Sequence, residues 1–351
     1  MRIEENKPLA PLTTLGIGGP ARWFVSAETE ADIAESAAWA REKGTPLFVL
    51  GGGSNLLVAD SGFNGLVLHI ALKGIKVQEG TPPTERLYQV AAGEDWDQFV
   101  QRTVEDDCAG LECLAGIPGT AGGTPVQNVG AYGQEVATTI ESVRVFNLRE
   151  TVFDTFSKRL CDFGYRRSLF NSQRGNWYIV TRVDFRLASG GRPSLQYADL
   201  QREFPSGTNP TLKQVAETVR RIRQSKGMLI VDGDADSRSA GSFFKNPIVP
   251  EAQLEGIALN SGAEPPRYSA GQDHANMVKL SAAWLIEKAG FPKGYALGRA
   301  GISTKHTLAL VNRGGATAAE ILALADKVSA SVAARFGIEL HIEPVMLGFD
   351  R

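Results

Sequence analysis

Two glycine-rich segments have the composition to bind phosphate groups through the backbone. The first is Gly51-Gly52-Gly53-Ser54-Asn55, which directly follows the apolar run TPLFVL (45–50). The second, residues 115–133, reads AGIPGTAGGTPVQNVGAYG and has few charged residues. Because glycine has no Cβ, successive backbone N–H groups in such segments can turn toward one anion. The two segments therefore indicate a phosphate, a pyrophosphate or a flat ligand held closely by the backbone.

Neither segment is a standard nucleotide-binding motif. The Rossmann pattern G-x-G-x-x-G would require glycine at position 56, where the sequence has Leu56. A P-loop is excluded because no Gly-Lys-Ser/Thr follows either segment. Taken alone, the first segment is also compatible with a tight turn after a strand. Composition does not identify the ligand.

A second set of candidates consists of polar side chains in apolar surroundings. They are Tyr165, Arg166 and Arg167 in GYRRS (164–168), Ser242, Lys245 and Asn246 in AGSFFKNP (240–247), and Glu343 in the last expected strand. Such groups can bind an anionic substrate and move protons. A solvated arginine pair, a helix start and an outward-facing glutamate are the alternative interpretations, which spacing alone favours.

No metal site is predicted. Asp232, Asp234 and Asp236 imitate the opening of a calcium loop, but Ser237 stands where that loop needs glycine and Phe243 where it needs glutamate. The four histidines are too dispersed to match a ligand spacing. The three cysteines fit neither a metal motif nor an even disulfide set, so we expect buried, reduced thiols.

Composition is that of an ordinary globular protein. The chain has 351 residues, 43% hydrophobic and 22% charged, with a net charge of −2. Its length favours two or three packed units. The balanced charge gives no footprint for nucleic acid. The first ten residues lack a signal-peptide pattern, and no 18-residue apolar stretch could span a bilayer, so the sequence predicts a cytoplasmic protein without a membrane segment.

The elements that must position these residues are helices with clear caps and short apolar strands. Capping patterns predict helices that begin at Thr29, Asp95 and Thr317. A helix that begins at Thr211 is expected from its apolar face, which includes Val215 and Val219. Strands are expected at 45–50, 65–70, within 141–187 and through IELHIEPVML (338–347). We expect a loop or boundary at 79–85, a linker at 188–210, and a strand with one face formed by Ile179, Val183, Phe185 and Leu187.

Together these segments resemble the UDP-N-acetylenolpyruvoylglucosamine reductases, also called UDP-N-acetylmuramate dehydrogenases. The similarity covers nearly the whole chain and keeps the order of the family's motifs, of which AGSFFKNP is the most specific. The matching segments are TTLGIGGPA (13–21), LGGGSNLL (50–57), AGIPGTAGGTPVQNVGAYGQE (115–135), FGYRRS (163–168), AGSFFKNP (240–247), KHTLALVN (305–312) and GIELHIEPV (337–345).

The resemblance implies an α+β fold. Its parts are an FAD-binding unit of the vanillyl-alcohol-oxidase type, made of two α+β subdomains, and a C-terminal α+β substrate domain. The implied boundaries are 1–72 and 73–216 for the two subdomains and 217–325 for the domain that holds the UDP-sugar. The resemblance leaves open that residues 326–351 fold back onto the first subdomain.

The resemblance also implies FAD as a cofactor and NADPH as a co-substrate. Some relatives of this FAD-binding fold attach the flavin through histidine; no histidine precedes His69 here, which favours non-covalent FAD. The cofactor contacts implied by the family are Leu50, Gly51, Gly52, Gly53, Ser54, Asn55, Ile117, Pro118, Gly119, Gly122, Gly123, Gln127, Asn128, Gly130, Ala131, Tyr132 and Gly133.

The implied reaction is reduction of an enolpyruvyl UDP-sugar in peptidoglycan precursor synthesis, and so in cell-wall formation, cell shape and division. NADPH reduces the flavin, and hydride transfer to the enolpyruvyl methylene then pushes charge onto the neighbouring carboxylate. Arg166 and Glu343 match the family residues placed at that carboxylate, with burial expected to raise the pKa of Glu343. Ser242 matches the residue that protonates the second carbon. Arg166 rather than Arg167 is assigned because it directly follows Tyr165, as in the family motif.

The implied substrate contacts are Tyr165, Tyr197, Lys226, Lys245 and Asn246. The two lysines would neutralise the diphosphate, with Asn246 hydrogen-bonded nearby, and Tyr197 matches a tyrosine that closes over the substrate in one branch of the family. The segment 228–239 departs in length from the family pattern, which puts the role of Lys226 in question. The only partner expected is the small-molecule substrate, with the chain acting as a monomer.

Two other functions are compatible with the residues. One is another FAD oxidoreductase of the same fold that acts on a sugar or hydroxy acid with oxygen as acceptor. SFFKNP and Glu343 argue against it. The other is a non-catalytic nucleotide-sugar sensor whose glycine-rich segments bind only diphosphate, and a flavin absorbance band would exclude it.

Overall fold

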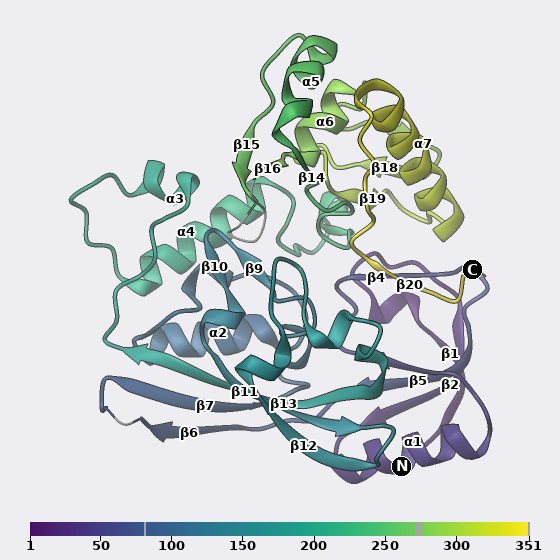
Figure 1. Ribbon diagram of the computed structural model, residues 1–351. Helices are drawn as coiled ribbons and strands as arrows, with labels where there is room; N and C mark the ends of the chain where they lie inside the picture. Colours follow the sequence, from purple (N-terminus) through teal and green to yellow (C-terminus); the bar gives the residue numbers. More distant parts are fainter. Residues whose placement is uncertain (81, 271–275, 350–351) are drawn as a thin grey trace. The chain divides into compact units, whose positions relative to one another are not determined.

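The computed structural model describes residues 1–80, 82–270 and 276–349, and contacts within the chain divide it into two compact units (Figure 1). The first unit comprises residues 1–7, 21–53 and 64–223. The second comprises residues 8–20, 54–63 and 224–351. Each unit therefore combines segments that are distant in the sequence. The predicted boundaries at residues 72, 216 and 325 remain predictions.

The first unit contains a four-stranded sheet, with a well-capped helix between two of its strands along the chain. The strand order is β1 (Glu4–Pro8), β2 (Pro20–Ala27), β5 (Phe63–Ile70) and β3 (Leu47–Leu50), with β3 parallel to β5. Helix α1 (Glu30–Glu42) begins with the predicted capping box, in which Asp32 N–H donates to Thr29 Oγ1 and Thr29 N–H donates to Asp32 Oδ2. Ile33, Ala37 and Ala40 are buried, as the helical periodicity predicts.

The first unit also contains a six-stranded sheet. Its main path is β12 (Val152–Ser157), β11 (Ile140–Asn147), β13 (Tyr178–Ser189), β7 (Glu85–Ala91) and β6 (Ile75–Glu79), and β8 (Cys108–Ala109) pairs with the end of β13. Helix α2 (Trp96–Glu105) is capped by Asp95, as predicted, and its Trp96 and Phe99 pack on Phe185 with ring centroids 5.7 and 5.2 Å away. Helix α4 (Leu212–Ser225) begins after Thr211 and buries the predicted Val215 and Val219.

The second unit is built from short strands and three helices in its described residues. One sheet has the order β14 (Ile248–Pro250), β16 (Met277–Leu280), β15 (Arg267–Ser269), and another the order β17 (Ala296–Leu297), β18 (Ala300–Ile302), β19 (Leu310–Asn312). The helices are α5 (Leu254–Ser261), α6 (Ala282–Lys288) and α7 (Ala318–Phe336). The capping box of Thr317 with Glu320 starts α7, which confirms the predicted start, and Gly337 ends the helix at φ +68.

The C-terminal segment departs from its prediction. We expected one strand through residues 338–347, but only β20 (Val345–Leu347) is a strand, and it runs parallel to β4 (Leu56–Val58). Ile342 forms an isolated bridge with Phe244. Glu343 therefore does not lie in the last strand. The chain pairs with the segment of Phe244 before Pro344 and with β4 after it, and the proline nitrogen cannot donate a ladder hydrogen bond at the change.

Two further predictions are corrected in the first unit. A β-bulge makes Val180 pair with Val145 while Val183 pairs with Val143, so Val180 rather than Ile179 shares a face with Val183. The segment 188–210 is not a plain linker, since it contains α3 (Ala198–Glu203) with a fully buried Leu200. The segment 79–85 joins the antiparallel strands β6 and β7 of one sheet.

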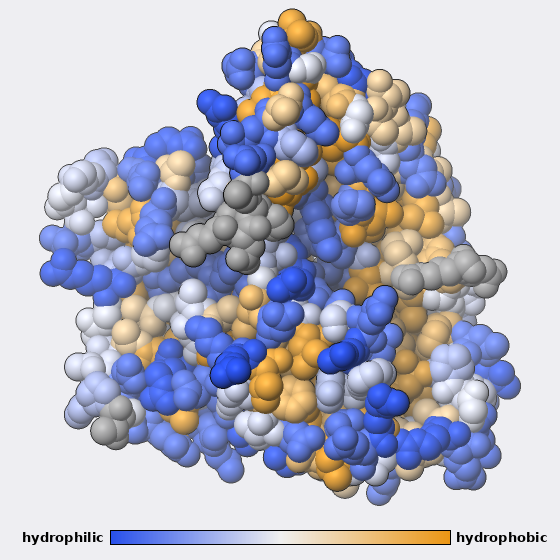
Figure 2. Space-filling view, viewed as in Figure 1, coloured by the Kyte–Doolittle hydropathy of each residue, from blue (hydrophilic) through white to orange (hydrophobic). Residues whose placement is uncertain are grey.

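The visible surface mixes hydrophilic and hydrophobic residues (Figure 2). The large apolar side chains that are exposed come from separate elements, among them Leu160, Ile230 and Leu259. Among the described residues, none of the helices combines the length and the apolar character required to cross a membrane.

Candidate functional site

The two glycine-rich segments meet in the first unit. A Cβ added to Gly52 would lie 2.6 Å from Gly119 Cα, and one added to Gly51 would lie 3.0 Å from Thr120 Oγ1. Contacts below 3.0 Å require displacement of backbone, so only glycine lets the two loops approach this closely. Gly53 and Gly119 have φ values of +62 and +127, which also favour glycine. The loops thus form one cradle of backbone groups that fits the demands of a pyrophosphate or a flavin.

The second loop is fastened to the start of α2. Trp96 N–H donates to Gly119 O at 3.1 Å, and Ala121 N–H donates to Glu94 O at 2.9 Å. Gly116 N–H donates to Asp97 Oδ1, and the same carboxylate pairs with both terminal nitrogens of Arg220 from α4. This side of the loop is therefore held by the scaffold.

The end of the second loop forms a small hairpin, β9 (Gly130–Ala131) and β10 (Gln134–Glu135). The buried Asn128 holds it, because its Nδ2 donates to Glu135 Oε2 and to Gly164 O, and its Oδ1 accepts from Ala137 N–H. Asn128 and Tyr132 both have positive φ, +45 and +49. Such strained non-glycine residues cluster at functional sites, which supports a ligand-binding role for the hairpin.

The structure distinguishes the two adjacent arginines. Arg166 has φ +52, is half-buried, and donates from Nη1 to Gly130 O of the hairpin at 3.2 Å. Arg167 pairs instead with Asp162 at 3.3 Å, with side chains 64% and 68% exposed. An exposed pair of this kind contributes little. Arg166 is thus the arginine that is joined to the predicted flavin loop.

Tyr165 and Tyr197 are both exposed, and Tyr197 lies against the hairpin. Its ring meets Tyr132 edge-on at 5.4 Å between centroids. A Cβ on Gly133 would lie 3.7 Å from Tyr197 N, so the Tyr197 backbone also lies beside the hairpin tip. Burial raises the pKa of the Tyr132 phenol to about 12, which keeps it protonated.

The second unit brings the backbone of Glu343 beside the segment that contains Ser242. Glu343 N–H donates to Phe243 O at 2.9 Å, and Lys245 N–H donates to His341 O at 2.9 Å. With the bridge between Phe244 and Ile342, these bonds make an antiparallel pairing in which Glu343 faces Phe243, the residue after Ser242. Gly241, at φ +72, turns the chain just before Ser242.

Ser54 and Asn55 of the first glycine-rich segment belong to this second unit. Asn55 Nδ2 donates to Glu343 O at 3.3 Å, and Val345 N–H donates to Asn55 O at 2.9 Å. Thr14 Oγ1 donates to Ser239 O at 2.6 Å and lies 3.4 Å from Ser54 O. The segment that begins as a glycine turn therefore ends by fixing the backbone of Glu343.

The remaining predicted substrate residues have different surroundings. Lys245 and Asn246 are half-buried, and Asn246 Oδ1 accepts from Ala282 N–H at the start of α6. Lys226 precedes Gly227, whose added Cβ would lie 3.2 Å from Ser303 Oγ and 3.4 Å from Asp236 Cβ. Lys226 thus lies just before the loop that contains Asp232, Asp234 and Asp236.

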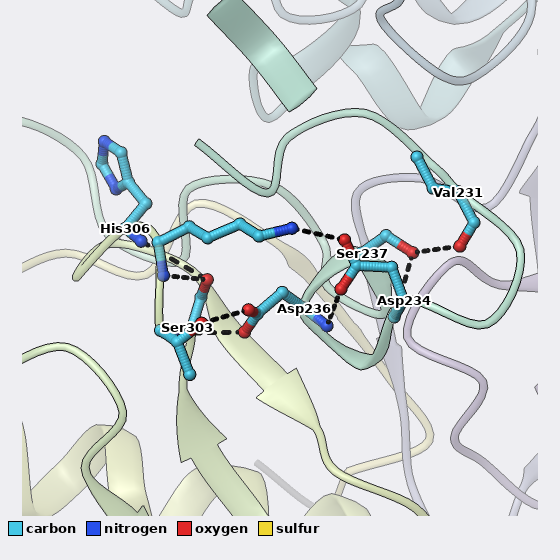
Figure 3. A network of polar contacts seen from close by, with 8 residues as sticks. Val231, Asp234, Asp236, Ser237, Ser303 and His306 are labelled. Atoms are coloured by element: carbon cyan, nitrogen blue, oxygen red, sulfur yellow. Dashed lines mark hydrogen bonds and ion pairs between the residues drawn. The ribbon is translucent and has the colours of Figure 1, made fainter. Parts of the chain in front are cut away.

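That acidic loop is an anchor for the segment 303–306 (Figure 3). Asp234 pairs with Lys305 Nζ at 2.5 Å, and Asp236 accepts from both the N–H and the hydroxyl of Thr304. His306 Nδ1 accepts from Leu308 N–H. Burial, together with Lys226 and Lys293, lowers the pKa of His306 to about 4. Among the described residues, no three His, Cys, Asp or Glu side chains form a metal-binding group, and His274 lies outside the described residues.

Sequence reasoning missed several residues that hold the site. Asp97, Arg220 and the fully buried Glu112 are charged residues that bond to partners far away in the sequence, so spacing gave no signal. Gln134 stands within the family motif but was not assigned a role. His306 also stands within a motif, KHTLALVN, and only the structure shows its neighbouring lysines.

Comparisons with known proteins match two different domain models to two parts of the chain. Residues 21–155 match the model of an FAD binding domain, and residues 233–347 match the model of the UDP-N-acetylenolpyruvoylglucosamine reductase C-terminal domain. The UDP-N-acetylenolpyruvoylglucosamine reductase of Streptomyces coelicolor is 47% identical over 98% of this chain and 90% of its own length. That of Thermobifida fusca is 46% identical over 98% and 97%. The crystal structure of the reductase from Thermus caldophilus is similar with a TM-score of 0.69 and 28% identity, covering 99% of both chains.

Proposed function

Since the chain belongs to the UDP-N-acetylenolpyruvoylglucosamine reductase family, we propose that Arg166, Ser242 and Glu343 carry out its substrate chemistry. The family activity is that of an FAD-dependent UDP-N-acetylmuramate dehydrogenase, which uses NADPH in peptidoglycan precursor synthesis. Within that activity, the role proposed for each residue is supported by its chemistry and its contacts.

The cradle of Gly51, Gly52 and Gly119 would hold the FAD, with the hairpin around Tyr132 beside it. The close backbone approach at Gly52 supports this, because it leaves no room for side chains that would cover the N–H groups. Once reduced by NADPH, a bound flavin would supply the hydride that the enolpyruvyl methylene of the substrate accepts. The protein must then stabilise the negative charge that develops at the substrate carboxylate.

Arg166 would bind that carboxylate. A guanidinium is a cation that presents several hydrogen-bond donors in one plane, which suits a carboxylate. The bond from Nη1 to Gly130 O holds Arg166 on the hairpin, and the left-handed backbone fixes its exit from the chain. One well-aimed donor at a developing charge contributes about 3–4 kcal/mol to the transition state.

Glu343 and Ser242 would complete the reaction from the second unit. A protonated Glu343 carboxyl would donate to the substrate carboxylate as its charge grows, which requires a raised pKa. Ser242 Oγ would give its proton to the second carbon of the enolate, a base strong enough to take it. The observation that best supports this proposal is that the backbone of Glu343 pairs with Phe243, the residue next to Ser242. One backbone ladder therefore positions the backbone of both residues.

Lys226 and Lys245 would neutralise the diphosphate of the UDP-sugar, Asn246 would add a hydrogen bond, and Tyr165 and Tyr197 would contact the substrate. The exposure of both tyrosines and the contact of Tyr197 with the flavin hairpin support this. We further propose that the chain acts as a monomer in the cytoplasm. Light scattering on the purified protein gives its mass directly, and a mass of two chains would overturn the first part.

The experiment that tests the function is anaerobic stopped-flow on the purified protein. NADPH added first should bleach the flavin absorbance near 450 nm, and the enolpyruvyl UDP-sugar added second should restore it with formation of UDP-N-acetylmuramate. Restoration by oxygen alone would instead indicate another oxidoreductase of this fold. A colourless protein that binds the UDP-sugar would indicate a sensor.

A further inference from the structure

A buried carboxylate joins the flavin hairpin to the segment that leads to Tyr197. Glu112 lies in the short 3-10 turn Glu112–Leu114 and is fully buried. Its Oε1 accepts from Gln134 Nε2 at 2.7 Å and from Ser194 N–H at 2.9 Å, and its Oε2 accepts from Gly110 N–H at 2.8 Å. Three separate segments of the first unit therefore meet at one side chain.

This carboxylate is stabilised by hydrogen bonds rather than by a counter-charge. Within the residues that the structure describes, no lysine, arginine or histidine forms an ion pair with Glu112. Burial and the adjacent Glu112 charge both raise the pKa of the Cys113 thiol, which stays protonated and donates to Ser194 O at 3.4 Å. A buried charge without a cation needs each of its donors, so losing any one of them is costly.

Gln134 extends the junction into the hairpin. Its side-chain amide donates to Glu112, and its Oε1 accepts from Cys113 N–H at 2.9 Å. Gln134 is also the first residue of β10, where it pairs with Ala131 of β9. The base of the hairpin is thus fixed to the 3-10 turn through both ends of one amide.

The tip of the same hairpin contacts the Tyr197 segment, which we define as residues 194–197. Tyr132 contacts the ring of Tyr197, three residues after Ser194, and Gly133 lies beside the Tyr197 backbone. The hairpin and the Tyr197 segment are therefore joined at two places, by Glu112 at the base of the hairpin and by the pair Tyr132 and Tyr197 at its tip. A change at the base must alter how the tip is presented.

We propose that Glu112 is a positioning residue that couples the flavin hairpin to the Tyr197 segment, so that the two move and bind as one element. The coupling rests on the proposed roles of the hairpin and of Tyr197. It adds a buried group that touches neither substrate nor cofactor but sets the orientation of residues at both. The chemistry lies in the carboxylate's capacity to accept three hydrogen bonds at once.

Glu112→Gln tests the coupling with almost no change of shape. The new amide can accept at one end only, and its NH₂ group faces a backbone or side-chain donor at the other. Asp184→Asn is the matched control, because Asp184 is also buried in the first unit and accepts from Ser142 and Arg182. Both variants lose a buried carboxylate, but only the first lies between the hairpin and Tyr197.

Hydrogen exchange on the FAD-loaded enzyme gives the first readout. In Glu112→Gln the amides of 130–135 and 194–199 should exchange faster together, whereas Asp184→Asn should leave both segments unchanged. Faster exchange confined to 110–113, or spread over the whole unit, would overturn the coupling.

Kinetics give the second readout. Glu112→Gln should raise KM for the enolpyruvyl UDP-sugar about tenfold, the effect of one lost hydrogen bond to a charged group, while the rate of flavin reduction by NADPH changes little. In a Tyr197→Ala background the same substitution should add no further increase. A full additional increase there would contradict the proposal. If Tyr197→Ala alone leaves KM unchanged, its role in the proposed function fails, and the exchange experiment still decides the role of Glu112.

Discussion

The hairpin of the first unit and the paired segments of the second present their functional side chains by different means. Arg166 is placed by backbone conformation: its own φ is positive, and it rests on a loop of glycines and of the strained Asn128 and Tyr132. Ser242 and Glu343 are placed by an antiparallel ladder between two extended segments. The first arrangement depends on which residues can adopt a backbone conformation with positive φ, and the second depends on which residues pair.

This difference teaches where each region is vulnerable. A Cβ in the glycine cradle displaces backbone and changes the binding surface itself. In the ladder, replacing a side chain leaves the backbone bonds of Phe243 and Glu343 intact. Replacing a glycine should therefore disable the first region, whereas replacing a side chain should remove a single chemical group from the second.

The largest effect is expected from Gly52→Val. The Cβ of the new side chain would lie only 2.6 Å from Gly119 Cα, so the cradle should open and FAD should be lost. Absorbance near 450 nm after purification measures the bound flavin. Gly256→Val is the control, because a Cβ at Gly256 meets no atom within 4 Å. Full flavin occupancy in Gly52→Val would remove this loop from the cofactor site.

Arg166→Gln should lower kcat by about 10²–10³-fold, the cost of one donor at a developing charge. Arg167→Gln should change kcat by less than about twofold, since Arg167 is exposed and pairs with the exposed Asp162. Steady-state kinetics with saturating NADPH measure both. Equal losses in the two variants would contradict the assignment to Arg166.

Glu343→Gln should lower kcat by about 10²-fold while changing UDP-sugar binding little, because an amide keeps the shape but cannot supply the acidic proton. The exposed Glu339→Gln serves as the control. Calorimetric titration of the UDP-sugar separates binding from turnover. Comparable losses in affinity and kcat would argue for a binding role instead.

The smallest effect is expected from His306, which tests the anchor in Figure 3. Its pKa of about 4 in the folded protein lies below the ordinary 6.5, so the unfolded chain takes up the proton first as the pH falls. The stability associated with neutral His306 is present above pH 6.5 and is lost progressively toward pH 4. His306→Gln should therefore lose less stability over that window, by at most about 3 kcal/mol. Urea unfolding at about pH 7.5 and about pH 5, on either side of the ordinary pKa, measures the difference, and an unchanged pH dependence would refute it.

The sequence predicted elements with local signals well. The capping boxes of Thr29 and Thr317 fixed the starts of α1 and α7, because the residues that cap them lie within one turn. It failed where a long-range pairing decides the outcome. The bulge that exchanges Ile179 for Val180, and the switch of partner at Pro344 that takes Glu343 out of the final strand, have no local signature.

The candidate site shows the same limit. Glycine patterns pointed to Gly52, but not to its contact with Gly119, which is formed by two segments far apart in the chain. Family motifs pointed to Arg166, and the positive φ and the bond to Gly130 now give a physical reason to separate it from Arg167. Glu112 carried no signal, because a glutamate between leucine and cysteine resembles any turn residue until its three donors are known.

The most direct test of the catalytic arrangement is anaerobic stopped-flow on Ser242→Ala. Its flavin should be bleached by NADPH at the rate of the unmodified enzyme, and the enolpyruvyl UDP-sugar should then produce no net UDP-N-acetylmuramate. Loss of both half-reactions would show that Ser242 is structural. Normal product formation would show that the proton comes from another group, and would contradict the proposed role of Ser242 in catalysis.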